Sequence, residues 1–242
     1  MTNLLTFNPD GKTITGVADK DITHVSIPEG VTEIGKGAFL GCKALQSIDT
    51  PNCVIEIGKG AFSRCSSLQS IVISDSVIDI GDCAFCGCSS LQSIYIPDSA
   101  RIIIGHCAFD RCSALKSINL PNNVTEIGEE AFYGCSSLQS IYIPKSVTEI
   151  GNCAFQGCSA LQSIDIPNCV KEIGDWVFYE CNLLETIHVH WTEIDSIIIS
   201  DTAFEINTEE CVLYIPSGTH NAYRNHPVFG KFKNIEIEKQ KY

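Results

Sequence analysis

Apolar residues recur along this chain with a fixed long period, and short polar segments separate them. Each unit reads I-G-x-x-A-F-x-x-C-x-x-L-x-S-I-x-I-P, and the phenylalanine serves as its anchor. Seven close copies follow one another at steps of 23 residues with a single step of 24, and a degenerate eighth follows after 26. The anchors are Phe39, Phe62, Phe85, Phe109, Phe132, Phe155, Phe178 and Phe204. A period of this size is typical of a solenoid, in which each unit buries its apolar face against its neighbours.

Within one unit, the apolar spacing predicts two short strands and one helical segment. Residues 31–35 are β-prone and end in glycine, and residues 45–51 alternate with period two before a proline. Between them the spacing i, i+1, i+4, i+7 predicts one buried face of a short helix or helical turn, formed by Ala38, Phe39, Cys42 and Leu45. Stacked units would form a parallel sheet with strands about 4.8 Å apart. The bulkier helical side lies opposite, so we expect the stack to curve with the sheet inside.

The two ends of the chain depart from the repeat and are expected to cover the exposed ends of the stack. Residues 1–21 contain Asn-Pro-Asp-Gly at positions 8–11 between two apolar segments, which predicts a capping hairpin. Residues 22–210 hold the repeats. Residues 211–242 begin with a last strand and continue into an aromatic tail, which we interpret as a C-terminal cap.

The repeated phrase and its short L-x-x-I-x-I-P strand resemble the BspA-like class of leucine-rich repeats over residues 22–216. The tail from Tyr223-x-x-x-Pro227 to Phe232 also looks like that family's C-terminal segment. The resemblance implies an α/β fold, namely a curved right-handed leucine-rich-repeat solenoid of about eight repeats with a parallel concave sheet and no catalytic activity. Many members of the family are surface or secreted proteins of bacteria and some protists that adhere to host proteins or other cells. The resemblance implies no ligand, because the consensus residues belong to the scaffold.

Charge and hydropathy exclude some partners. The formal net charge of −13 disfavours nucleic acid, whose phosphates attract Lys and Arg. No apolar run approaches the roughly 20 residues that a membrane span needs. The first residues lack a basic region followed by a long apolar run, so no signal peptide is visible. An intracellular protein and the mature form of an exported one both fit this start, although the family resemblance favours the cell surface.

The fourteen cysteines fall into a regular column and a scattered remainder. Adjacent members of the column would hold their Cβ atoms parallel at nearly the strand spacing, beyond the roughly 3.8 Å of a relaxed disulfide. We therefore expect reduced thiols acting as small apolar side chains, which suits a reducing compartment. The column comprises Cys42, Cys65, Cys88, Cys112, Cys135, Cys158 and Cys181.

The remaining cysteines indicate no metal or redox site. Cys83, Cys107 and Cys153 share the position before the Ala-Phe pair, so a Cys83–Cys107 contact between adjacent units and chance recurrence both remain open. The segment 83–88 contains C-x-x-C, but a zinc site usually needs a second such pair or histidines at ligand spacing.

The sequence predicts no enzyme and no cofactor. His188 and His190 could share one face of a strand, but no third ligand is identifiable, which is more typical of plain surface. No nucleophile motif, phosphate-binding glycine loop or paired catalytic carboxylates are present.

Function is best sought at strand positions that vary between units. Beside the buried middle isoleucine, one outward position is nearly always serine and the other changes at almost every step. The changing position predicts a recognition stripe formed by Tyr95, Asn119, Tyr142, Asp165 and His188. Tyrosine supplies rigid contact area with a polar tip. The alternative is that tyrosine simply favours an exposed sheet.

A second column is acidic: Glu33, Glu56, Asp79, Glu126, Glu149 and Glu172, interrupted by Ile103. Like charges about 5 Å apart repel, so a cation or a basic partner could bind there. Alternatively, the column is a solvated edge that keeps the solenoid soluble and monomeric.

These observations favour a non-enzymatic, monomeric module that binds a host or cell-surface protein on its concave sheet. An intracellular scaffold is the first alternative and a carbohydrate-binding module the second.

Overall fold

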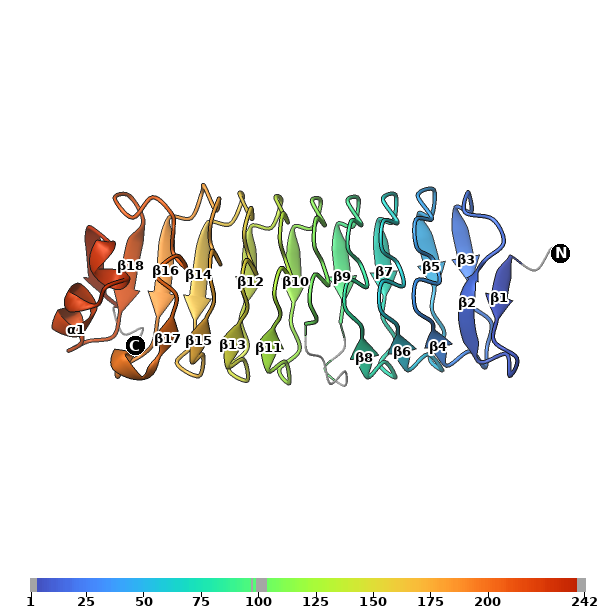
Figure 1. Ribbon diagram of the computed structural model, residues 1–242, viewed down its shortest axis with the longest axis horizontal. Coiled ribbons are helices and arrows are strands. Elements are labelled where there is room, and N and C mark those ends of the chain that lie inside the picture. Colours follow the sequence, from blue (N-terminus) through green and yellow to red (C-terminus); the bar gives the residue numbers. More distant parts are fainter. Residues whose placement is uncertain (1–3, 97, 99–103, 239–242) are drawn as a thin grey trace.

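The computed structural model describes residues 4–96, 98 and 104–238. Ile103, the expected interruption of the acidic column, lies outside the described residues. The turns of the chain stack one behind another into an elongated solenoid, with β1 at one end and α1 at the other (Figure 1). The sequence prediction of a solenoid of parallel strands is therefore confirmed.

One side of the solenoid is a row of ten short strands within the described residues, each one turn after its neighbour. They are β3 (His24–Ser26), β5 (Ser47–Asp49), β7 (Ser70–Val72), β9 (Ser93–Tyr95), β10 (Ser117–Asn119), β12 (Ser140–Tyr142), β14 (Ser163–Ile166), β16 (Thr186–Val189), β18 (Val212–Ile215) and β19 (Asn234–Ile237). All hydrogen-bonded pairs in this row are parallel. The count exceeds the expected eight repeats by two, because β3 and β19 do not follow an anchor phenylalanine of the repeat. We call this row the first strand row and its outward surface the strand face.

A second strand row consists of two-residue strands, each of which follows a strand of the first row after a turn of the backbone. Its members are β4 (Glu33–Ile34), β6 (Glu56–Ile57), β8 (Asp79–Ile80), β11 (Glu126–Ile127), β13 (Glu149–Ile150), β15 (Glu172–Ile173) and β17 (Ile198–Ile199). Ile104 forms a single parallel bridge to Ile127. At the N-terminal end, β1 (Leu5–Phe7) pairs antiparallel with β2 (Thr13–Val17), and β2 joins this row beside β4. The hairpin therefore covers the first turn.

The segment that contains the anchor phenylalanine is not a helix but a run of turns, which we call the turn row. From Phe39 to Phe178, the residues two before and two after each anchor have φ between 51° and 73°, a left-handed conformation that interrupts any helix. Along this segment, backbone N–H groups alternate between two kinds of hydrogen-bond acceptor. One N–H donates to a carbonyl three residues earlier, as Leu40 does to Gly37 O at 2.9 Å, and the next donates to the following repeat, as Phe39 does to Ala61 O at 2.8 Å. Of the two predicted alternatives, the short helix is wrong and single turns take its place, while the four apolar residues are buried as expected.

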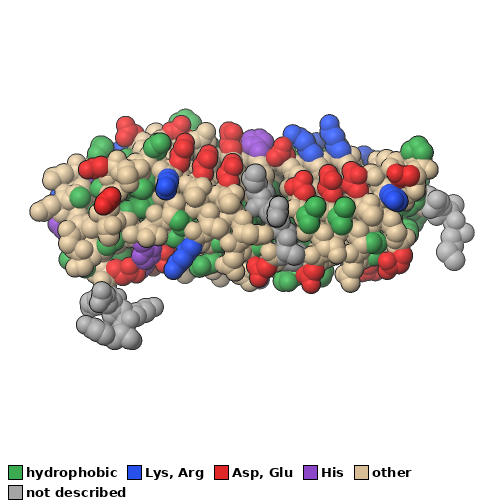
Figure 2. Space-filling model, turned by 90° about the horizontal axis from the view of Figure 1, so that it is seen from below, with side chains coloured by type: hydrophobic (Ala, Val, Ile, Leu, Met, Phe, Trp, Pro, Cys, Tyr) green, Lys and Arg blue, Asp and Glu red, His purple; other side chains and the backbone are tan. Residues whose placement is uncertain are grey.

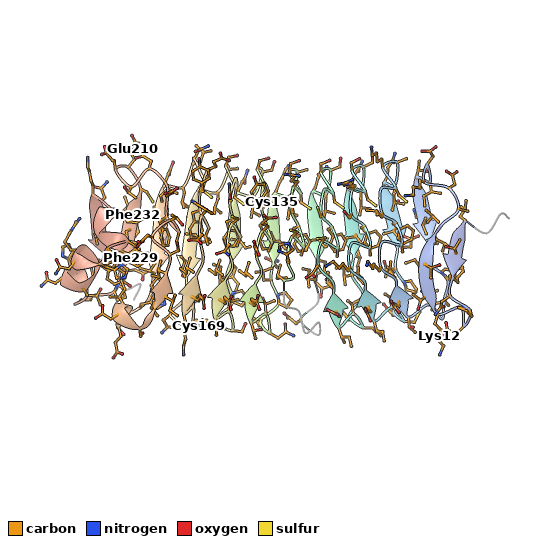
Figure 3. All side chains as sticks on the ribbon, in the orientation of Figure 1. Lys12, Cys135, Cys169, Glu210, Phe229 and Phe232 are labelled. Atoms are coloured by element: carbon orange, nitrogen blue, oxygen red, sulfur yellow. The ribbon has the colours of Figure 1, made fainter. Side chains whose placement is uncertain are left out.

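The core is a column of stacked rings beside a column of thiols. Eight phenylalanine rings, from Phe39 to Phe204, stack with centroids 5.1–5.7 Å apart. Six thiols each donate to the carbonyl of the anchor in the preceding turn at 3.1–3.2 Å: Cys65, Cys88, Cys112, Cys135, Cys158 and Cys181. Burial raises the pKa of Cys65 and of Cys181 to about 12, which keeps these thiols protonated as donors. Cys135 is labelled in Figure 3.

An aromatic cluster closes the C-terminal end. This end contains the short helices η1 (Ile194–Ser196), α1 (His220–Asn225) and η2 (Phe229–Lys231). The rings of Phe229, in η2, and Phe232, both labelled in Figure 3, pack against Phe204 with centroids 5.4 and 6.1 Å away. The Tyr223 hydroxyl donates to Trp191 O at 2.9 Å. Because β19 pairs with β18, the C-terminal tail also adds a strand to the first strand row. Within the described residues α1 is the longest helix, and none is long and apolar enough to span a bilayer.

Candidate functional site

The residues of the recognition stripe occupy the third position of successive strands in the first strand row. Asn119 pairs with Tyr142, Tyr142 with Asp165, and Asp165 with His188, so one register carries four of the five residues. Tyr95 occupies the same position on β9, which lies beside β10. These side chains point outward because the central isoleucine of each strand is buried. The structure thus brings the five predicted residues into one row.

Two tyrosines dominate the exposed surface of the stripe. The side chains of Tyr95 and Tyr142 are each 56% exposed, although both belong to short central strands. Val72 pairs with Tyr95 and is 67% exposed, so the apolar surface continues towards the N-terminal end. The strand face therefore leaves a mixed aromatic and apolar surface open to solvent at its centre.

Three shallow depressions follow the stripe. The first, of about 340 Å³, lies between Tyr95 and Asn119. The second, of about 390 Å³, lies between Tyr142 and His190, and the third, of about 490 Å³, lies between Asp165 and Tyr214. Asp165 lines both the second and the third depression. Side chains of a partner could therefore enter successive depressions along one line.

At its C-terminal end, the stripe meets a network of histidines and carboxylates. His190 Nε2 lies 2.8 Å from Asp165 Oδ1, and Glu238 bridges the two histidines, with Oε1 3.5 Å from His188 Nδ1 and Oε2 3.4 Å from His190 Nδ1. The His188 ring stacks on Tyr214 with centroids 4.5 Å apart. His188 is thus half-buried, which distinguishes it from the open tyrosines.

Sequence reasoning missed this network because it found no third group beside the histidine pair. Glu238 follows β19 and reaches the histidines only because that strand pairs with β18 outside the repeat. The period-two spacing of His188 and His190 did indicate the histidine pair, but Glu238 has no such signal in the sequence.

The acidic column is confirmed as two aligned runs in the second strand row. Glu33 pairs with Glu56 and Glu56 with Asp79, while Glu126 pairs with Glu149 and Glu149 with Glu172. Figure 2 shows acidic side chains in short rows along this edge. Burial, and then the neighbouring carboxylates, raise the pKa of Glu56 and of Glu149. The carboxylates therefore repel one another at neutral pH.

We expect the substitution Glu149→Gln to raise the Tm at pH 7 by about 1–2 °C, because the amide removes a repelling charge from a half-buried site that solvent still screens. The raised pKa of Glu149 means that ionisation costs stability in the folded state, and this cost disappears as the pH falls towards the ordinary value of 4.5. The difference in Tm should therefore shrink on acidification, as thermal melts by circular dichroism between pH 7 and 4.5 would show. Glu185→Gln, outside the column, is the control, and an equal gain there would refute the column effect.

The described residues hold the cysteines as free thiols rather than as a disulfide framework. The Cys107 thiol donates to Glu130 Oε2 at 3.2 Å, and the Cys86 thiol donates to Asp110 Oδ2 at 3.2 Å. The suggested Cys83–Cys107 contact is therefore not the main interaction of Cys107.

Comparison with known proteins supports this architecture. A family model described as the BspA-type leucine-rich repeat region matches residues 18–103 and 96–208. A leucine-rich repeat protein from T. pallidum is 32% identical, with a TM-score of 0.67, over 76% of this chain and 89% of that one. A leucine-rich repeat protein from Bacteroides ovatus is 26% identical, with a TM-score of 0.63, over 97% of this chain and 67% of that one. A search of curated proteins gave no match.

Proposed function

Because the chain belongs to the BspA-type leucine-rich repeat family, we propose that it is a non-enzymatic module that holds another protein against its recognition stripe. The observation that supports this most is the exposure of Tyr95 and Tyr142 on either side of Asn119. Tyrosine buries a large area at little cost in conformational entropy and can still hydrogen-bond through its hydroxyl. Such residues, placed at the centre of an interface, often supply most of the binding energy.

The charge of the protein supports a particular kind of partner. With a formal net charge of −13 and Asp165 between two depressions, the strand face favours a partner surface that is basic or neutral. Opposite charges would accelerate association, and the association rate would then fall as salt is added. We propose adhesion to a host or cell-surface protein as the biological setting, on the strength of the family resemblance.

The test compares the wild type with the double variant Tyr95→Ala/Tyr142→Ala in capture from host and bacterial lysates. The matched control is Tyr133→Ala/Tyr179→Ala, which also removes two tyrosines two turns apart, but from the turn row. We expect the captured protein to be lost from the stripe variant and kept by the control. The binding of the purified partner should weaken at least about tenfold, since central aromatic residues commonly contribute more than about 1.4 kcal/mol.

The other possible results of this experiment either refute the stripe as the binding site or favour one of the alternative functions. Circular dichroism first shows that both double variants remain folded. Capture that survives in the stripe variant, or is lost equally in the control, refutes the stripe as the binding site. Retention of the wild type on a glycan array but not by proteins would favour the carbohydrate-binding alternative. A partner that is itself intracellular would favour the scaffold alternative.

A further inference from the structure

One backbone position of the turn row favours glycine but is occupied by other residues in several repeats. Two residues before each anchor, the first two repeats of the turn row have Gly37 and Gly60, with φ of 62° and 63°. The equivalent residues Cys107 and Glu130, in adjacent turns, have φ of 54° and 55°. The backbone of residues other than glycine is strained in this left-handed conformation. The column therefore brings a thiol and a carboxylate to adjacent turns at a sequence separation of 23 residues.

Three groups that commonly bind metals converge at this column. One ligand atom each from His106, Cys107 and Glu130 lies within 4.8 Å of the others. The Cys107 thiol already donates to Glu130 Oε2 at 3.2 Å. Cys107 is buried, Glu130 is half-buried and His106 is exposed, so the cluster opens to solvent on the histidine side. A hydrated cation could enter from that side.

We propose that His106, Cys107 and Glu130 form a binding site for a borderline-soft divalent cation of the Zn²⁺ type. Zinc binds thiolate, imidazole and carboxylate at about 2.0–2.3 Å, usually in tetrahedral geometry. Ligand atoms within 4.8 Å need only small side-chain movements to surround one ion. On binding, the Cys107 S–H bond breaks, the proton passes to bulk water, and the thiolate sulfur bonds to the metal. A water molecule would complete the coordination.

The surroundings favour a cation at this place. The Glu129 carboxylate lies 3.8 Å from His106 Nδ1, and carboxylates beside a ligating histidine commonly orient the ring and strengthen it as a ligand. The network of His188, His190, Asp165 and Glu238 differs because its groups already pair with one another and include no thiol. The site on the turn row is also separate from the recognition stripe, so the two proposals can fail independently.

The test uses Co²⁺ as a spectroscopic probe with the full chain, in the presence of a reductant that is not a thiol. We expect one equivalent of Co²⁺ to produce thiolate-to-cobalt charge-transfer absorption, which Zn²⁺ then abolishes by displacing the cobalt. Cys107→Gly should remove this absorption. Glu130→Gly should weaken the affinity about tenfold or more, in the range seen for altered metal sites. Both changes introduce the residue found at Gly37 and Gly60, so the fold should be kept.

Two controls make the outcome decisive. Cys153→Gly changes a thiol at the same column position, with φ of 55°, outside the three proposed ligands, and His190→Ala disrupts the other histidine cluster. Both should leave the charge-transfer absorption unchanged. Absence of this absorption in the wild type, or its persistence in a folded Cys107→Gly variant, overturns the proposal. Loss of metal binding in His190→Ala would also overturn it and assign the metal to the C-terminal histidines.

Discussion

Replacing Phe132 by alanine should lower the free energy of unfolding by about 3–5 kcal/mol. The Phe132 side chain is fully buried, and its ring stacks 5.4 Å from Phe109 and 5.5 Å from Phe155. Each turn of a solenoid is stabilised only by its own residues and by its two neighbours. A cavity at Phe132 therefore weakens both interfaces of a central turn.

Urea unfolding followed by two signals would measure this effect. Circular dichroism reports the whole chain, whereas both tryptophans, Trp176 and Trp191, lie in the C-terminal half. In the wild type we expect the two transitions to coincide. In Phe132→Ala they should move to lower urea and separate, because the halves become less strongly coupled. Tyr142→Ala removes an exposed aromatic ring and should change the stability by about 0.5 kcal/mol or less. An equal loss in both variants would contradict the role of the ring column.

The second large effect is expected at Gly151, where adjacent turns approach closely. A Cβ atom at this position would lie 2.6 Å from Glu129 N and 2.8 Å from Gly128 C. Both are backbone atoms, which cannot rotate away, so Gly151→Ala must push the turns apart. We expect a loss of about 3 kcal/mol or more, measured by urea unfolding.

Gly105 provides a matched control because it occupies the same place in its repeat. There a Cβ atom would lie 3.0 Å from Asp82 Oδ1 and 3.4 Å from the nearest backbone atom. The Asp82 side chain can rotate away, so Gly105→Ala should cost clearly less than Gly151→Ala. Equal losses at the two positions would show that backbone contact between turns does not set the spacing.

The sequence predicted the parts of the fold that depend on periodic burial. The strand row follows from period-two alternation, and the ring and thiol columns follow from the fixed spacing of Phe and Cys. The turn row was misread because the spacing of Ala38, Phe39 and Cys42 fits a helix as well as a run of turns. The signal that distinguishes the two is glycine on both sides of the anchor, at Gly37 and Gly41, where the backbone is left-handed.

Predicting the sites required contacts that the period alone does not give. The row of the recognition stripe was predictable, because residues at one position of a repeat must align. The cluster of His106, Cys107 and Glu130 escaped notice because its ligands come from adjacent turns and form no short motif. Aligning the turns would have placed Cys107 beside Glu130. Glu238 could not be placed in this way, because it follows a strand that pairs outside the repeat.

The hydrogen bonds between turns within the turn row all run in one direction, so this row is electrically polar along the solenoid axis. Between turns, the N–H groups point towards the C-terminal end, as where Gly37 donates to Lys59 O at 3.0 Å and Gly41 to Ser63 O at 2.8 Å. The aligned peptide dipoles add, as they do in a helix, and leave carbonyl oxygens as the negative pole at the first turn. The Lys20 ammonium group lies 2.9 Å from Leu40 O at that pole. A second copy could continue the row only head to tail, and Lys20 occupies the place where its N–H groups would bind.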